Sequence, residues 1–171
     1  MKKLIVLVLV GIVFYITCSL TAQYLYSYKV QRIISNSPQS STFDIECESK
    51  DVNDLMQYSL EYTLNELDFK LASSGNLDIT SLKQTKTANC IGYVTFYNAV
   101  LNKLLKDNHI TNVKIQHARA TINVASYDVH EFLTDPSFKN HDISIVTLSD
   151  GTVYYIDPSL SEMGTLLIFK Q

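Results

Sequence analysis

The stretch Thr87-Ala88-Asn89-Cys90-Ile91-Gly92-Tyr93, with the apolar run that follows it to Leu105, decides the fold of this 171-residue chain. Apolar side chains recur there at steps of three and four residues: Ile91, Tyr93, Val94, Phe96, Tyr97, Val100, Leu101, Leu104 and Leu105. This spacing predicts an α-helix. Because the apolar positions cover more than one stripe, we expect the helix to be buried on several sides.

Cys90 falls in the first turn of this predicted helix. Thr87 or Asn89 can cap the helix, because either side-chain oxygen can accept a hydrogen bond from an unpaired backbone N–H group. Both choices put the thiol at the positive end of the helix dipole, which favours the thiolate. From this stretch alone two interpretations stay open: a nucleophile, or a small hydrophobic residue of the core, since free cysteines are often buried.

The rest of the chain predicts an α+β domain. Apolar residues on one face predict a helix from about residue 51 to residue 67, and alternation predicts a strand over 113–121. Two further strands, 141–148 and 152–158, flank Asp150-Gly151, which is typical of a hairpin turn. Helices combined with an antiparallel sheet around one core define the α+β class.

Three motifs follow one another in the chain: Cys90 with Tyr93 on a helix, His141 opening a strand, and Tyr155-Ile156-Asp157-Pro158 ending the next strand. In this order and on these elements, residues 52–160 resemble the transglutaminase-like branch of the papain-type thiol enzymes. The resemblance implies a papain/transglutaminase-like core, in which a helix bearing the nucleophile packs on an antiparallel β-sheet. It also implies a catalytic triad of Cys90, His141 and Asp157.

Each member of this triad would have a distinct role. A thiol nucleophile needs a base to take its proton and a third group to orient that base. His141 would act as the base and later as the acid, while Asp157 would orient the imidazole and stabilise its charged form. We expect residues 77–86 to be a loop. Within it, Gln84 lies six residues before Cys90, where papain-like enzymes place the glutamine of the oxyanion hole.

This reading makes the protein a thiol enzyme that acts on amide bonds of a protein or peptide, by hydrolysis or by acyl transfer. The alternative is an inactive binding or scaffold domain of the same fold; the absence of tryptophan favours it and the complete Cys-His-Asp set disfavours it. A zinc site of Cys90, His141 and Asp157 has acceptable ligand types, but the helix-start cysteine favours a nucleophile. We therefore expect no metal and no cofactor. His117 on the predicted strand 113–121 is more simply an exposed or hydrogen-bonded residue than a cleft residue.

The amino terminus predicts membrane attachment. Met1-Lys2-Lys3 precedes 17 uncharged residues, Leu4 to Leu20, and tyrosines follow. We expect residues 1–28 to form an uncleaved transmembrane signal anchor with the rest of the chain outside the cytoplasm; the alternative is a signal peptide whose cleavage releases a secreted protein. Residues 29–50 would be a linker with a possible short strand at 43–48, and residues 51–171 the domain. The net charge of −3 argues against nucleic acid as a partner.

Cys47 is the other cysteine outside the apolar segment. An exported domain can pair two cysteines in a disulfide. We expect instead that distance keeps Cys90 unpaired and reactive.

The hairpin register decides whether the triad can form, because side chains alternate between the two faces of a strand. With a two-residue turn, His141 and Asp157 would lie on opposite faces. With a three-residue loop, Ser149-Asp150-Gly151, Leu148 pairs with Thr152 and Asp157 comes opposite Ile143, one diagonal step from His141. We therefore expect that loop, Gly151 at positive φ, and the His141 ring directed at Asp157 on the face covered by the Cys90 helix.

Overall fold

A computed structural model describes residues 26–35, 43–71, 78–132, 141–162 and 168–170. The chain divides into two compact units, one of residues 30–120 and 140–171 and the other of residues 1–29 and 121–139. The elements, in chain order, are β1 (Tyr26–Ser35), α2 (Val52–Glu66), β2 (Asp68–Phe69), α3 (Ile79–Thr85), β3 (Thr87–Ala88), α4 (Cys90–Asp107), β4 (Lys114–Val124), β5 (Tyr127–Asp128), η1 (Val129–Phe132), β6 (His141–Thr147), β7 (Val153–Ile156), α5 (Pro158–Ser161) and β8 (Ile168–Lys170).

The sheet is antiparallel at each pairing whose register the structure gives, so the predicted α+β class is confirmed. Its hydrogen-bonded order is β1-β4-β6-β7-β8, with β5 paired to β4. The pairs β4–β6, β6–β7 and β7–β8 are antiparallel. The short strands β2 and β3 form a separate parallel pair. Within the described ranges, no helix is long and apolar enough to cross a membrane.

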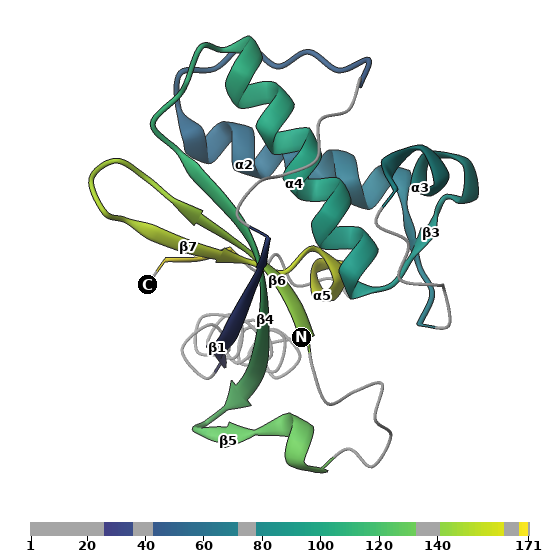
Figure 1. The fold of residues 1–171 in the computed structure, drawn as a ribbon, viewed down its shortest axis with the longest axis vertical. Coiled ribbons are helices and arrows are strands. Elements are labelled where there is room, and N and C mark those ends of the chain that lie inside the picture. The colour runs from purple at the N-terminus through teal and green to yellow at the C-terminus, as the bar shows by residue number, and fades with distance from the viewer. Residues whose placement is uncertain (1–25, 36–42, 72–77, 133–140, 163–167, 171) are drawn as a thin grey trace, which may run out of the picture. The chain divides into compact units, whose positions relative to one another are not determined.

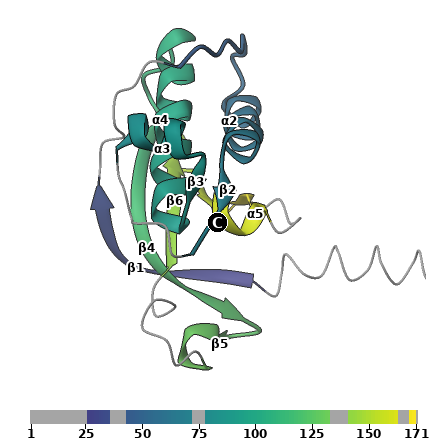
Figure 2. The ribbon, with the colours of Figure 1, turned by 90° about the vertical axis from the view of Figure 1, so that its right-hand side faces the viewer.

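Helix α4 lies between the sheet and α2, as Figures 1 and 2 show. It packs against β6 on one side and against α2 on the other. Tyr93, Phe96 and Tyr97 on α4 have no exposed surface. This double burial confirms the expectation drawn from its apolar pattern, since a helix covered on two sides needs apolar residues beyond one stripe.

Helix α2 covers α4 with a single apolar face. Its N-cap Asp51 accepts a hydrogen bond from the backbone N–H of Asn53, and Leu55, Met56 and Leu60 are buried against the core. Burying each such leucine contributes about 2 kcal/mol relative to leaving it exposed. The second face of α2 carries polar residues and needs no partner.

Three expectations about the first half of the chain are wrong. Tyr26–Ser35 is the strand β1, so neither the membrane segment to residue 28 nor the linker from residue 29 has the predicted bounds. The alternating tyrosines that suggested a membrane interface also suit a strand, and Tyr28 is buried. Residues 1–25 of the predicted anchor lie outside the described residues. At 43–48 the chain alternates in burial but forms no strand.

The expected loop at 77–86 is also wrong, because most of it is the helix α3. Asp78 caps α3 by accepting hydrogen bonds from the backbone N–H groups of Thr80 and Ser81. Lys86 ends it in the left-handed conformation, with φ of 55°. The helix has seven residues, too few for its periodicity to stand out in the sequence.

The predicted hairpin register is confirmed. Ser144 pairs with Ile156 and Thr147 with Val153, which brings Asp157 opposite Ile143. The Leu148 N–H donates to the Thr152 carbonyl at 2.9 Å, which closes the three-residue loop. Gly151 has a φ of 86°, as this loop requires.

Replacing Gly151 tests the cost of that loop. A Cβ at this position would meet no atom within 4 Å, so backbone strain alone opposes a side chain. We expect Gly151→Val to lower the free energy of unfolding by about 1–3 kcal/mol in urea denaturation, because a β-branched residue resists positive φ. Gly151→Asn is the matched control and should lose much less, because asparagine tolerates this region. Equal losses in the two variants would contradict this account.

Candidate active site

Cys90 is the first residue of α4 and is half-buried. Asn89 is the N-cap: its Oδ1 accepts hydrogen bonds from the N–H groups of Ile91 at 3.1 Å and Gly92 at 3.3 Å. Thr87, the other predicted cap, belongs to β3. The Cys90 N–H group, in the first turn of α4, has no acceptor within the helix. The helix dipole and this donor together make the start of α4 suited to a negative charge on or beside the sulfur.

Tyr93 fixes the start of α4 against the rest of the domain. Its hydroxyl donates to the Leu67 carbonyl at 2.6 Å and contacts the Glu162 carboxylate. Burial, and then the hydrogen bond with Glu162, raise the pKa of Tyr93, so it stays a neutral donor. Because Leu67 follows α2 and Glu162 follows α5, one side chain joins the N-terminus of α4 to both elements.

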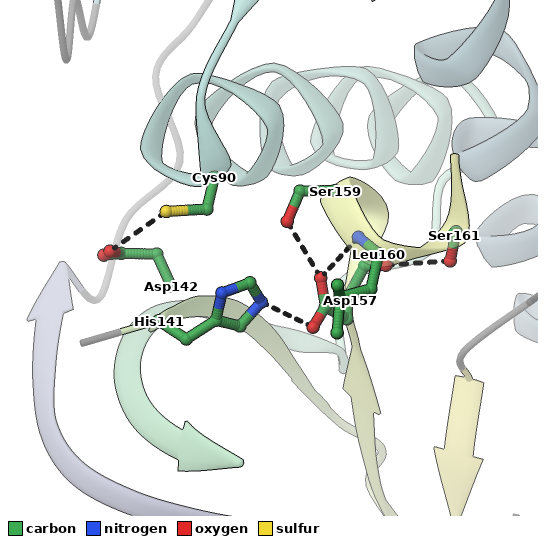
Figure 3. A network of polar contacts seen from close by, with 7 residues as sticks. All are labelled: Cys90, His141, Asp142, Asp157, Ser159, Leu160 and Ser161. Atoms are coloured by element: carbon green, nitrogen blue, oxygen red, sulfur yellow. Dashed lines mark hydrogen bonds and ion pairs between the residues drawn. The ribbon is translucent and has the colours of Figure 1, made fainter. Parts of the chain in front are cut away.

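His141 and Asp157 are in direct contact, as the register predicts. Nε2 of His141 lies 2.6 Å from Oδ2 of Asp157, and Asp157 has no exposed surface. Its Oδ1 accepts hydrogen bonds from the Ser159 hydroxyl and the Leu160 N–H, both at 3.0 Å. Asp157 is thus also the N-cap of α5. Figure 3 shows the His141 ring between Asp157 and Cys90, so the structure brings all three predicted residues together.

The surroundings of His141 favour its charged form. Burial lowers the pKa of the ring, but the Asp157 charge and hydrogen bond, with smaller contributions from the Cys90 side chain, raise it to about 10. An imidazolium between a thiol and a carboxylate is the state that stabilises a thiolate.

A second acid–base pair, which the sequence did not reveal, lies on the other side of the thiol. Oδ2 of Asp142 is 3.8 Å from Sγ of Cys90, which donates to it, and Oδ1 of Asp142 is 2.8 Å from Nε2 of His117. The Asp142 and His117 side chains are only 4% and 6% exposed. His117 is therefore a buried hydrogen-bonded residue rather than an exposed one.

The strand alternation explains how Asp142 takes this place. Ser144 of β6 donates to Asn98 of α4, which identifies the even-numbered residues of β6 as those facing the helix. Asp142 belongs to this set and His141, the first residue of the strand, does not. The His141 ring nevertheless reaches the N-terminus of α4, where it lies between Asp157 and Cys90. The signal that was missed is the alternation itself, which places Asp142 and Ser144 on the same face of β6.

Gln84 and Cys47 are the other residues that the sequence analysis singled out. Gln84 is exposed on α3, so its role at an oxyanion remains a prediction. Cys47 and Cys90 are both free of a disulfide. Asn108, at the far end of α4, donates to the Cys47 carbonyl at 2.8 Å. An 18-residue helix is about 27 Å long, so the two thiols sit too far apart to pair.

Within the part of the chain that the structure describes, no group of three or more histidine, cysteine or acidic side chains is arranged to hold a metal ion. The zinc alternative for Cys90, His141 and Asp157 therefore gains no support from geometry.

Comparison with protein-family models, curated proteins and solved structures finds no match to this chain. The site is therefore interpreted from its own geometry.

The raised pKa of His141 predicts how stability depends on pH. The folded ring binds a proton up to about pH 10, whereas an unfolded histidine loses it near 6.5. The folded state thus binds more protons between these values, and the stabilisation, complete below pH 6.5, is lost as pH rises towards 10.

We compare His141→Gln with the unmutated ring, both in a Cys90→Ala background so that the thiol does not titrate. The difference in the free energy of unfolding should shrink by at least about 2 kcal/mol between pH 6.5 and 10, because one pKa unit corresponds to about 1.4 kcal/mol and Asp157, the larger cause of the raised pKa, remains. A difference that does not change over this range would contradict the assignment of a protonated His141.

Proposed function

We propose that this chain is a thiol enzyme of transglutaminase-like type, which acts on amide bonds of a protein or peptide through Cys90, His141 and Asp157. One observation carries the proposal: a buried His–Asp pair lies beside a half-buried thiol at the N-terminus of a helix. A structural cysteine needs neither a charged imidazole nor a helix N-terminus beside it. A nucleophilic thiolate is stabilised by both.

Each of the three residues would have one role in the proposed reaction. Asp157 holds Nε2 of His141, which leaves Nδ1 of the ring for the thiol proton. Sγ of Cys90 would attack the amide carbon and form a C–S bond, while the C–N bond breaks and the Nδ1 proton goes to the departing amine. The Cys90 N–H group and the helix dipole would stabilise the negative oxygen of the intermediate.

The thioester then passes its acyl group to an acceptor. His141, neutral after the first step, takes a proton from the acceptor as it attacks, and the C–S bond breaks to restore the thiol or thiolate. Water as acceptor gives hydrolysis, and an amine gives a new amide bond. We favour hydrolysis, because a domain this small offers little surface for a second protein substrate.

Thiol reactivity tests the proposal without a known substrate. In the full-length chain, iodoacetamide should alkylate Cys90 at pH 6 about tenfold faster than Cys47, because a larger fraction of Cys90 is thiolate. Peptide mass spectrometry separates the rates at Cys18, Cys47 and Cys90. His141→Ala should remove most of the difference, whereas His109→Ala, on an exposed histidine, should not. Equal rates at Cys90 and Cys47 in the unmutated protein would overturn the proposal.

Activity separates the enzyme from an inactive scaffold of the same fold. Incubation of the full-length chain with a library of peptides should release new amino termini, and Cys90→Ser should abolish the release. Fast alkylation of Cys90 with no turnover on any amide would leave the scaffold as the better interpretation.

The proposal extends to location: residues 1–25 would anchor the domain to a membrane, with the described residues outside the cytoplasm. The support is the sequence Met1-Lys2-Lys3 followed by an uncharged span. In cells that express the chain, protease added to intact spheroplasts should digest the domain while a cytoplasmic marker survives. Protection of the domain would contradict this orientation, and a mature amino terminus near residue 23 would instead indicate cleavage and secretion.

A further inference from the structure

The Cys90 thiol lies between two ionisable groups of opposite charge. On one side is the His141 ring, whose charged form favours the thiolate; on the other is the Asp142 carboxylate, to which Sγ donates at 3.8 Å. A carboxylate accepts a hydrogen bond from S–H but repels a thiolate. Figure 3 shows the thiol directed at Asp142.

We propose that Asp142, held by His117, is a positioning residue that keeps the Cys90 thiol protonated in the free protein and so restrains the nucleophile. This inference rests on the proposed thiol chemistry of Cys90. The proton stays on Sγ, shared with Oδ2 of Asp142, until it is lost to water and the thiolate forms beside the charged ring of His141.

Burial makes this contact strong enough to matter. The Asp142 side chain is 4% exposed, so water screens its charge little. Its Oδ1 is taken by His117, which leaves Oδ2 with the thiol as its partner among the described residues. His117 thus fixes the carboxylate at Oδ1, while Oδ2 faces the sulfur of Cys90.

A purely structural role explains the pair less well. A buried ionisable pair is weak evidence for stability, since apolar residues of similar volume often serve as well. The attachment of α4 to β6 already has its own polar contact, the hydrogen bond from Ser144 to Asn98. What Asp142 adds is a charge beside the sulfur.

The elements around the thiol carry other charged groups. On β4, Arg119 is directly opposite Asp142 in the register, and His117 is the residue of this strand whose ring contacts Asp142, at 2.8 Å. Asp157 is engaged by His141 and the first turn of α5. On α4, the last turn carries Lys106 and Asp107, at the opposite end from Cys90.

The test is the pH profile of Cys90 alkylation in the full-length Asp142→Asn variant. Asparagine keeps the shape and an acceptor oxygen but removes the charge. We expect the rate at pH 6 to rise about tenfold over the unmutated protein and the profile to move to lower pH, with Cys47 unchanged as internal control. A merely structural Asp142 would change stability without this acceleration. An unchanged or slower Cys90 rate in a folded variant overturns the inference.

His117 provides a matched pair of variants. His117→Gln keeps a donor for Oδ1 of Asp142 and should leave the Cys90 profile close to that of the unmutated protein. His117→Ala removes the donor and should raise the alkylation rate of Cys90 towards the rate in Asp142→Asn. The same acceleration in both His117 variants, or in neither, contradicts the supporting role of His117.

An infrared measurement on the unmutated protein decides the matter if Asp142→Asn does not fold. The S–H stretching band of Cys90, assigned by difference from Cys90→Ser at pH 6, should lie at lower frequency than that of Cys47, because it donates to a carboxylate. A missing Cys90 band, or one at the Cys47 frequency, overturns the inference.

Failure of this inference is distinguishable from failure of the proposed function. If Cys90 and Cys47 are alkylated equally fast in the unmutated protein, the thiol chemistry itself fails. If Cys90 is alkylated faster than Cys47 and its rate depends on His141 but does not change in Asp142→Asn, only the proposed restraint by Asp142 is contradicted.

Discussion

The buried carboxylate of Asp157 is the constraint on which the site depends. Because it has no exposed surface, its charge is tolerated only when donors surround it. They come from two elements: Nε2 of His141 at the start of β6, and Ser159 with Leu160 in the first turn of α5. Asp157 therefore fixes the short helix and the imidazole together. The ring cannot turn away without leaving a buried charge with one strong donor fewer, which is a large cost.

The contact between His141 and Asp157 can form in only one of two adjacent registers of the β6–β7 pair. The turn between these strands, which lies outside the site, therefore determines whether the site forms. The loop closed by the Leu148–Thr152 hydrogen bond sets the pairing of Ser144 with Ile156, and thereby the diagonal from Asp157 to His141. Tyr93 then places α4 against the same corner, because its hydroxyl contacts Glu162 just after α5. The turn, the strand pair and the Tyr93 contact each act over a short range. Together they bring residues from distant positions in the sequence into the site.

Local patterns predicted one part of this arrangement and could not predict the other. The helix α4, its cap at one of two candidate residues and the hairpin register follow from periodicity, capping chemistry and alternation, which act within a few residues. The pair of His117 and Asp142 has no such signal, since it joins adjacent strands two residues out of direct register. β1 was misread because alternating tyrosines serve a strand and a membrane interface equally well. α5 and β8 are too short to show periodicity.

The double burial of α4 explains why the chemistry lies at its start. A helix covered by the sheet and by α2 can hold few polar groups along its length, and Asn98 is accommodated there by its bond with Ser144. Its N-terminus combines free N–H groups, a positive dipole and a half-buried residue, so a reactive thiol fits there and nowhere else on the helix. The first two residues of β6 then lie on two sides of the sulfur. His141 brings a cation to the sulfur and Asp142 an anion, so one step along a strand sets the balance between thiolate and thiol.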